Sequence, residues 1–200
     1  EASLFVVAAR APSGEPGLYI VERGSEGLSI EAQPAMGLRA AGLARLRFDK
    51  VALSENARIG DANSLDYDRF IMLGRLAWCA LAAGTARAVL DAVIPYANER
   101  VAFGEPISQR QSIAFMISNI GIETDGMRLT MLRAVSRYER GESAVRETQL
   151  ARTLVARHGM QIGSDGVQIL GGHGFVKEYP LERWYRDLRA AGMMEGGLCL

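Results

Sequence analysis

A single acidic residue near the end of the sequence stands among apolar and small neighbours. Glu195 follows Met193 and Met194 and precedes Gly196 and Gly197. Removal of water raises the pKa of a carboxyl group, and a carboxylate with a raised pKa can take up a proton near neutral pH. The pattern therefore makes Glu195 a candidate general base, although an acid at such a position is more often solvated.

A glycine-rich run, Gly171-Gly172-His173-Gly174, precedes this acid. Glycine lacks a Cβ, so such a run occurs where the backbone bends sharply or approaches a ligand closely. A plain turn is the more common explanation. The combination with an isolated acid indicates that function concentrates in the C-terminal part of the sequence.

The elements that must position these residues divide into a strand-rich part, residues 1–62, and a helical part, residues 63–200. Short β-prone runs cover residues 4–9 and 18–21, and a turn rich in proline and glycine separates them. In residues 44–49, Ala44, Leu46 and Phe48 alternate with polar residues, as in a strand covered on one side. Since the chain begins within a strand, we expect further strands of the same sheet upstream.

Helical periodicity begins near Ser64 and continues for roughly thirty residues, with small positions such as Gly84 that permit a neighbour to approach. Further helices are expected from about 108 to 140, from about 143 to 170, and from 181 to 190. Ser108 and Gln111 fit a capping box, Gly141 a helix stop and Ser143 a helix cap. The expected apolar positions are Ile71, Leu76, Ala80, Ala83, Val89, Leu90, Val93 and Ala97, then Ile113, Met116, Ile117, Ile120, Met127 and Met131, then Leu150, Leu154 and Val155. The predicted fold class is α+β, a partial β-sheet followed by an up-and-down four-helix bundle.

Composition narrows the function classes. Lys plus Arg and Asp plus Glu number 23 each, so no net field favours nucleic acid or an anionic membrane surface. Charged residues interrupt the apolar runs before the roughly 20 residues of a bilayer span, and we expect no membrane span. Cys79 and Cys199 are expected to be free thiols in a reducing compartment. His158 has no second ligand one helical turn away, so no metal site is predicted.

Four short motifs of the sequence resemble motifs of a known protein family. YANERVAFGEPI, residues 96–107, with Gln111 after it, resembles the YAxxRxxFGxPIxxxQ signature of the acyl-CoA dehydrogenase family; VQILGGHGF, residues 167–175, resembles the family's VQILGGxGF/Y. YPLERWYRD, residues 179–187, is similar to YPxERxYRD, and Met194-Glu195-Gly196 to YEGT. The resemblance covers nearly the whole chain and implies part of the family's middle β domain followed by its C-terminal four-helix bundle.

The resemblance implies FAD held across a subunit interface, and therefore a homo-oligomer, a dimer of dimers. Positions matching the family's cofactor contacts are Arg100, Phe103 and Gln111 from one chain and Gln168 and Gly172 from its neighbour. Arg75 matches a substrate contact of the family. A helix arginine that only extends its charged group to solvent would give the same sequence pattern. Met194 and Gly196 flank the base at the substrate. We expect Glu195 to face a groove between the glycine run and the loop at residues 101–104.

The activity implied is α,β-dehydrogenation of an acyl-CoA thioester to the trans-2-enoyl-CoA, in fatty acid or related lipid metabolism. Glu195 would remove the α-proton, and its backbone N–H would donate to the thioester oxygen. Electrons would pass to an electron-transferring flavoprotein, in the cytoplasm or, in a eukaryote, in the mitochondrial matrix. Two alternatives stay open: a non-catalytic partner subunit of a hetero-oligomeric dehydrogenase, and an acyl-CoA oxidase or flavin monooxygenase on the same scaffold.

Overall fold

The computed structural model describes residues 2–11, 13–60 and 67–194. The chain forms two compact units: one comprises residues 1–35 and 39–71, and the other residues 36–38 and 72–200. The units separate within the first helix, between Ile71 and Met72. The predicted boundary near residue 62 lies in the gap between the described ranges and stays a prediction.

The first unit is built from antiparallel strands. Strands β1 (Leu4–Arg10), β2 (Pro16–Glu22) and β5 (Arg58–Ile59) form one sheet in the order β1-β2-β5, and β3 (Leu28–Ala32) pairs with β4 (Ala44–Phe48) in another. Short 3-10 turns cover Arg39–Ala41 and Glu55–Ala57. The predicted strands β1, β2 and β4 are confirmed, whereas β3 and β5 were not predicted. On β4 only Leu46 is half-buried, while Ala44 and Phe48 are exposed, so the expected covered face is wrong at those two positions.

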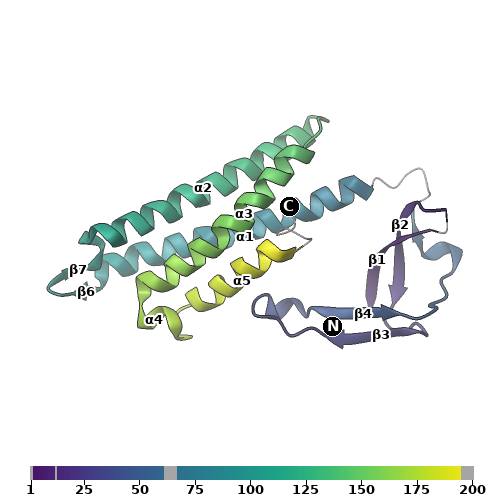
Figure 1. Ribbon diagram of the computed structural model, residues 1–200, viewed down its shortest axis with the longest axis horizontal. Coiled ribbons are helices and arrows are strands. Elements are labelled where there is room, and N and C mark those ends of the chain that lie inside the picture. Colours follow the sequence, from purple (N-terminus) through teal and green to yellow (C-terminus); the bar gives the residue numbers. More distant parts are fainter. Residues whose placement is uncertain (1, 12, 61–66, 195–200) are drawn as a thin grey trace. The chain divides into compact units, whose positions relative to one another are not determined.

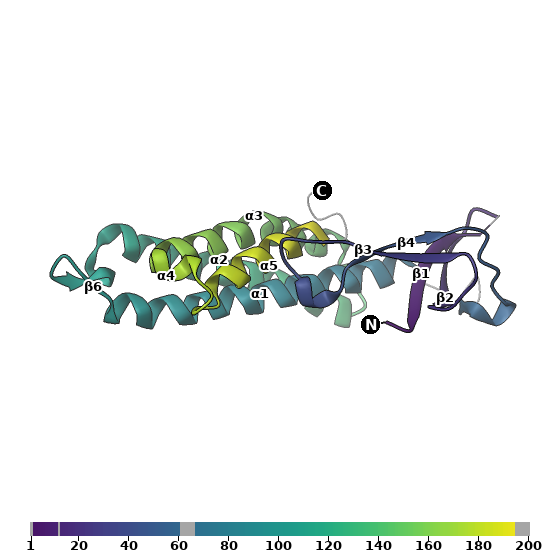
Figure 2. The ribbon, with the colours of Figure 1, turned by 90° about the horizontal axis from the view of Figure 1, so that it is seen from below.

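The second unit is helical. It comprises most of α1 (Tyr67–Glu99), then α2 (Gln111–Glu139), α3 (Val145–Leu170), the short α4 (Gly172–Phe175) and α5 (Leu181–Met193). A hairpin of β6 (Val101–Ala102) and β7 (Glu105–Pro106) and a 3-10 turn at Ile107–Gln109 join α1 to α2. Figures 1 and 2 show α1, α2 and α3 side by side, α5 along α3, and the hairpin and α4 at one end of the helical unit.

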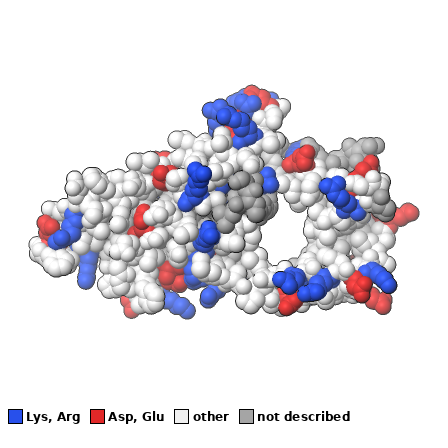
Figure 3. Space-filling view, viewed as in Figure 1, with Lys and Arg blue, Asp and Glu red and all other residues white. Residues whose placement is uncertain are grey.

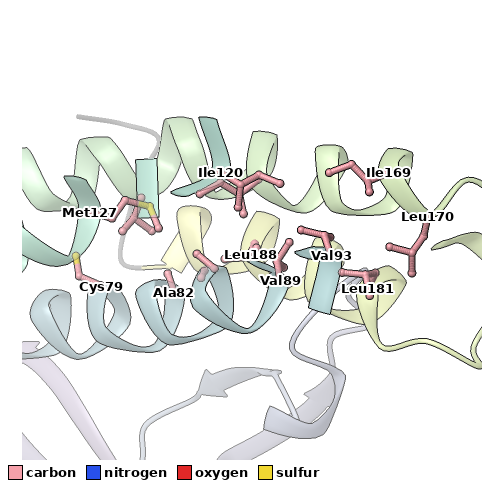
Figure 4. Packing of buried hydrophobic residues seen from close by; sticks show 14 of the residues in the cluster. Cys79, Ala82, Val89, Val93, Ile120, Met127, Ile169, Leu170, Leu181 and Leu188 are labelled. Carbon is pink, nitrogen blue, oxygen red and sulfur yellow. The ribbon is translucent and has the colours of Figure 1, made fainter. Parts of the chain in front are cut away.

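The core of this unit lies between α1, α2, α3 and α5. Figure 4 shows side chains from all four helices turned toward a common interior, among them Val89, Ile120 and Leu188. The predicted apolar stripe of α1 is confirmed at Leu76, Ala83, Val89, Val93 and Ala97. Ala80 is exposed, and no described atom lies within 4 Å of a Cβ placed on Gly84, so the described residues make no close approach at Gly84.

Burial on α2 and α3 follows the predicted pattern with one exception. Ile120 and Met127 are fully buried, and Ile113, Met116, Ile117 and Met131 pack against the core cluster. On α3, Val155 is buried and Leu154 half-buried. Leu150 is 44% exposed, so its predicted place on the apolar side is wrong.

The helix ends differ from the predicted caps. Arg110 and Ala144 precede α2 and α3, and neither makes a side-chain capping hydrogen bond, so the predicted roles of Ser108 with Gln111 and of Ser143 are wrong. Gly141 is confirmed as the stop after α2: it has φ +72°, and its N–H donates to the Tyr138 carbonyl at 2.9 Å. The 3-10 turn at residues 107–109 occupies the place where the capping box was expected.

Charged side chains of both signs are interspersed on the face shown in Figure 3. The cluster at the top of that view lies over the α2–α3 connection, where Arg137 and Arg140 both pair with Glu142. Glu147 is buried beneath it and lies 3.5 Å from Nε of Arg137. These ion pairs tie the start of α3 to the end of α2.

Helix α1 is long and apolar enough, by length and composition, to cross a membrane, with a mean hydropathy of 1.4 over its most apolar window. The sequence analysis expected no membrane span, because charged residues interrupt the apolar runs, and did not anticipate that α1 would meet this criterion. The helix also supplies eight buried residues, from Leu76 to Ala97. A helix at the centre of a bundle has the same composition for that reason.

Candidate functional site

The β6–β7 hairpin presents an aromatic side chain at its tip. Phe103 has φ +55° and Gly104 φ +89°, the pair of positive angles that a two-residue hairpin turn requires. A bulky residue at positive φ is uncommon and costs conformational energy. Phe103 is 93% exposed, and the Arg110 guanidinium lies 4.9 Å from the centre of its ring, in a cation–π contact. The hairpin thus holds an aromatic ring out into solvent.

The glycine run forms the turn between α3 and α4. Gly171 has φ +58°, a conformation that favours glycine, and its N–H donates to the Gln168 carbonyl at 3.1 Å. A Cβ on Gly174 would lie 2.3 Å from the Val167 carbonyl oxygen. The prediction of a sharp backbone turn is confirmed, and the short helix α4 that follows it was not predicted.

A cavity of about 320 Å³ lies where the end of α1 meets the end of α3. Arg100 comes from the residue after α1, and Gly171 and Gly172 come from the turn after α3. Among the described residues the Arg100 guanidinium makes no recorded hydrogen bond or ion pair, and it is exposed. The remaining lining residues are Tyr96, Ile107, Ile169, Leu170 and His173.

Two aromatic rings, those of Tyr96 and His173, line this cavity, and a third ring packs against them. Tyr96 Oη lies 2.9 Å from Nδ1 of His173 and donates to the Leu170 carbonyl at 3.2 Å. Tyr179 packs against both rings, at 5.7 Å from Tyr96 and 5.6 Å from His173. Sequence reasoning did not assign this cluster, although both tyrosines and the histidine fall inside the recognised motifs.

A second group of polar side chains lies deeper in the bundle. Arg152 on α3 is fully buried. Its Nη1 donates to the Ala191 carbonyl at 3.1 Å, and its Nη2 donates to the Met194 carbonyl, so it binds the C-terminal end of α5. Cys79 on α1 lies against it; burial raises the pKa of the Cys79 thiol to about 11, and the Arg152 guanidinium offsets part of that rise.

Arg75 is placed one turn before Cys79 on the same face of α1. It is half-buried, and its Nε is buried with no hydrogen-bond partner among the described residues. A buried donor without a partner is costly, and such groups are rare in folded proteins. Arg75 therefore carries unused hydrogen-bonding capacity, as a ligand contact would.

Of the predicted site residues, the structure brings Arg100 and Gly172 of the same chain together in one cavity, whereas the resemblance implied that they contact the cofactor from two different chains. Phe103, Gln111 and Gln168 are exposed and do not line it. Met194 is half-buried at the end of α5, and Glu195 and Gly196 lie outside the described residues.

The expected place of Glu195, facing the groove between the glycine run and the loop at residues 101–104, stays a prediction, because Glu195 lies outside the described residues. Helix α5 has 13 residues, which is about 20 Å at 1.5 Å per residue. Met194, which follows it directly, and α4 are at opposite ends of α5 (Figure 1). Within one chain, the length of α5 therefore separates Met194 from the glycine run.

The sequence contained a signal for Arg152 that was not used. Buried positions on α3 recur at Thr148, Arg152, Val155 and Gly159, spaced by three and four residues. An arginine inside such a stripe is either exposed by local distortion or buried with partners. Its partners here are the carbonyls of Ala191, at the end of α5, and of Met194, the residue after that helix, which the spacing on α3 could not identify.

Comparison with known proteins gives consistent matches. The family described as "Acyl-CoA dehydrogenase, C-terminal domain" matches residues 67–197. The chain is 32% identical over 181 residues to the caffeyl-CoA reductase-Etf complex subunit CarC of Acetobacterium woodii, and 30% identical over 187 residues to an acyl-CoA dehydrogenase of Bacillus subtilis. Each match covers 89% of this chain and 48% of the relative, so the chain spans about half the length of these relatives.

The fold also matches solved structures. The structure of PigA with FAD and proline superimposes with a TM-score of 0.89 over 98% of this chain and 53% of that protein. Its sequence identity to this chain is 23%, and the likeness is one of fold. The predicted fold class, a partial sheet followed by a helical bundle, is confirmed.

Proposed function

The chain belongs to the acyl-CoA dehydrogenase family, and on this premise we propose that the full-length protein is an FAD-dependent oxidoreductase that forms a double bond between Cα and Cβ of an acyl-CoA thioester. The observation that carries the proposal is the cavity in which Arg100 meets Gly171 and Gly172. These residues belong to two of the motifs by which the sequence resembles the family.

The cavity residues fit a phosphate-bearing cofactor. A guanidinium matches the geometry and charge of phosphate oxygens. A Cβ on Gly171 or Gly172 would have no atom of the described chain within 4 Å, so a ligand has room to lie against the backbone there. A cavity of about 320 Å³ is smaller than an extended dinucleotide, and it would hold the phosphate-bearing portion of FAD.

The rest of the cofactor needs a second surface. Phe103 projects from the hairpin tip, and Gln111 and Gln168 are exposed. The length of α5, about 20 Å, separates the cavity from Met194, so a flavin ring held near Met194 would meet the cavity of another copy more readily than that of its own chain. This supports a homo-oligomer, which the proposal takes to be a dimer of dimers.

Bound in this way, FAD would supply the oxidant that accepts hydride from Cβ of the thioester. The chain's own contribution would be Glu195 as the base that removes the α-proton, since its sequence neighbours are methionines and glycines, and a site closed to water would raise the proton affinity of a carboxylate. Met194 and Gly196 flank the reacting carbons, and Arg75, with its unused Nε, is a substrate contact. The product is the trans-2-enoyl-CoA.

Electrons would leave through an electron-transferring flavoprotein. One relative, a caffeyl-CoA reductase subunit, is named as part of an Etf complex. The name of that relative also describes the reverse reaction, and by microscopic reversibility the same base would return a proton to Cα during reduction. The direction is therefore tested by offering both a saturated thioester with an artificial electron acceptor and an enoyl thioester with a reductant.

The decisive experiment replaces Glu195 by glutamine in the full-length protein. Glutamine keeps the shape and removes the base, so the variant should retain bound flavin while the rate of dehydrogenation across a panel of acyl-CoAs falls by about 10²–10⁴-fold. Glu178→Gln, at an exposed position in the α4–α5 connection, is the control and should match the wild type. Turnover at the wild-type rate in Glu195→Gln would remove Glu195 from the role of base, and a wild-type protein that binds no flavin would refute the proposed function.

A further inference from the structure

The cavity at the ends of α1 and α3 contains a histidine that the cofactor argument has not used. His173 lies in α4, is half-buried, and lines the cavity together with Arg100. Histidine is the side chain that changes its charge in the range between about pH 5 and 8. The described lining residues include no aspartate or glutamate. The cavity therefore combines the permanent positive charge of Arg100 with one basic group whose charge depends on pH.

Tyr96 determines which nitrogen of His173 carries a proton. Its Oη lies 3.2 Å from the Leu170 carbonyl, which can only accept, and 2.9 Å from Nδ1 of His173. A phenol has one proton to donate, so both hydrogen bonds form only when Oη donates to the carbonyl and accepts from Nδ1–H. Leu170 is the last residue of α3, and a carbonyl at a helix end needs such a partner. Nδ1 of His173 is therefore a donor whether the ring is neutral or charged.

Two tyrosine rings hold the imidazole in place. Tyr96 meets the ring of His173 edge to face, with the ring centres 6.0 Å apart and the planes at 89°. Tyr179, from the connection between α4 and α5, lies against His173 at 5.6 Å and against Tyr96 at 5.7 Å. A side chain that is already held by its neighbours loses little freedom when it binds a ligand.

The second ring nitrogen of His173, Nε2, is left for a ligand. It makes no recorded hydrogen bond within the described chain, and it is not one of the buried polar atoms that lack a partner. With the proton on Nδ1, a neutral ring has a lone pair at Nε2, whereas an imidazolium has a charged N–H there. A lone pair repels a phosphate oxygen, and a charged N–H donates to it. Only the protonated ring fits a phosphate bound at Arg100.

We propose that His173 is a second cationic contact for the phosphate-bearing part of the cofactor, held by Tyr96 so that its Nε2–H donates to a phosphate oxygen beside Arg100. The inference rests on the proposed function, in which this cavity holds that part of FAD. FAD then binds most tightly where the imidazole is charged, and binding weakens as the pH rises through the range in which histidine loses its proton. Tyr96 is a positioning residue, because it acts through the imidazole.

The described groups around His173 supply no other charge change in this range. Arg100 and Tyr96 come from the end of α1 and Tyr179 from the α4–α5 connection, and neither arginine nor tyrosine titrates between about pH 5 and 8. The last turn of α3 carries no ionisable side chain. On α5, which also packs on α4, Glu182 is paired with an arginine one turn later at 2.8 Å. The exposed residues of the connection are Lys177 and Glu178, without a recorded contact to the imidazole.

The test measures the Kd of FAD at several pH values between about 5.5 and 8.5. The full-length, flavin-loaded protein is diluted at each pH, and the flavin that dissociates is followed by its fluorescence until equilibrium. The pyrophosphate of FAD stays ionised throughout, so a change in Kd reports on the protein. The wild-type Kd should rise about 10-fold across the window, the lower end of what a charge-assisted hydrogen bond contributes, because solvent reaches the cavity.

His173→Gln should give a Kd that hardly changes with pH, because an amide keeps the same charge throughout. The matched control is His158→Gln. His158 is paired with Glu123 at 3.0 Å and does not line the cavity, so this variant should keep the 10-fold change of the wild type. Helical circular dichroism at both ends of the window establishes that the variants are folded.

Tyr96→Phe tests the positioning step. Without Oη, a neutral ring can carry its proton on Nε2 and still donate to phosphate, so the change in Kd with pH should be smaller than in the wild type. A purely structural role of the hydroxyl would instead move Kd by the same factor at every pH. Should His173→Gln not fold, Tyr96→Phe decides: a smaller pH dependence supports the inference, and a profile parallel to the wild type overturns it.

A wild-type Kd that does not change with pH would overturn the inference, as would equal changes in wild type and His173→Gln. Dephospho-CoA, which also carries a pyrophosphate, is tested by calorimetry on the flavin-loaded protein, since the substrate has phosphates too. A pH-dependent affinity for dephospho-CoA that His173→Gln abolishes, with none for FAD, would overturn the assignment to the cofactor. A wild-type protein that holds no flavin at any pH refutes the proposed function itself, and this inference with it.

Discussion

Replacement of Gly163 by alanine tests how closely α3 and α5 must pack for the end of α5 to be held in place. Gly163 lies in the middle of α3, and a Cβ there would be 2.7 Å from Cα of Tyr185 on α5 and 3.2 Å from its Cβ. Ordinary contact begins at 3.4 Å, so the two helix backbones must separate locally by about 0.7 Å, the difference between 3.4 and 2.7 Å. Backbone atoms cannot rotate away as a flexible side chain can.

Two effects of opposite sign set the magnitude. Forcing an extra methyl into a packed interface costs about 1–3 kcal/mol, and alanine in a helix interior is favoured over glycine by about 1 kcal/mol. Gly159→Ala is the matched control, because Gly159 lies one turn earlier and faces the same helix, with its nearest new contact at 3.6 Å from the Leu188 carbonyl oxygen. The helix-propensity gain cancels between the two variants, so Gly159→Ala should exceed Gly163→Ala in unfolding free energy by about 1–3 kcal/mol.

The assay is urea unfolding of the full-length protein, followed by the helical circular dichroism signal at equal protein concentration. If the α3–α5 separation matters to the site, Gly163→Ala should also have a lower kcat than Gly159→Ala with flavin content unchanged. Equal urea midpoints, or a more stable Gly163→Ala, would refute the packing argument. A difference in stability with identical kcat would show that the end of α5 tolerates this displacement.

Helix positions followed from the sequence because their burial is periodic. Ile120 and Met127 on α2, seven residues apart, are both fully buried as the pattern predicted. Gly141 marked the end of α2 because glycine accepts a positive φ that other residues avoid. Helical periodicity and a glycine stop depend only on neighbouring residues, so both can be predicted without knowing the tertiary structure.

The strands and caps that were missed depend on partners that the sequence does not reveal. Strand β3 is held by pairing with β4, and its residues, Leu28–Ala32, lack a long β-prone run. The hairpin after α1 requires positive φ at Phe103, which no propensity would assign to a phenylalanine. The capping box at Ser108 failed because a 3-10 turn intervenes before α2 begins.

The site residues likewise fall into those that the sequence could predict and those that depend on the tertiary structure. Arg100 and Gly172 were selected by their resemblance to family motifs, but their meeting follows from topology: the first and third helices of an up-and-down bundle end on the same side. Arg152 lacked such a guide, because its role depends on where α5 stops. The motifs thus selected two residues that line one cavity, whereas the partners of Arg152 became visible only in the tertiary structure.

Two further predictions concern charge. Arg100→Ala in the full-length protein should lower the flavin retained after gel filtration, whereas Arg87→Ala, an exposed arginine of α1 paired with Asp91 at 2.8 Å, should not; equal flavin content in both would remove Arg100 from the cofactor site. The second concerns Cys79, whose thiol pKa is raised by burial from 9.0 to about 11. Between these two values the unfolded chain has lost the thiol proton and the native chain has kept it, so the native state binds more protons and stability falls as pH rises. The contribution is fully present below pH 9.0 and is lost by about pH 11. Urea unfolding across this window should therefore show a steeper loss of stability in the wild type than in Cys79→Ala, and parallel pH profiles would mean that the buried thiol does not titrate as its surroundings require.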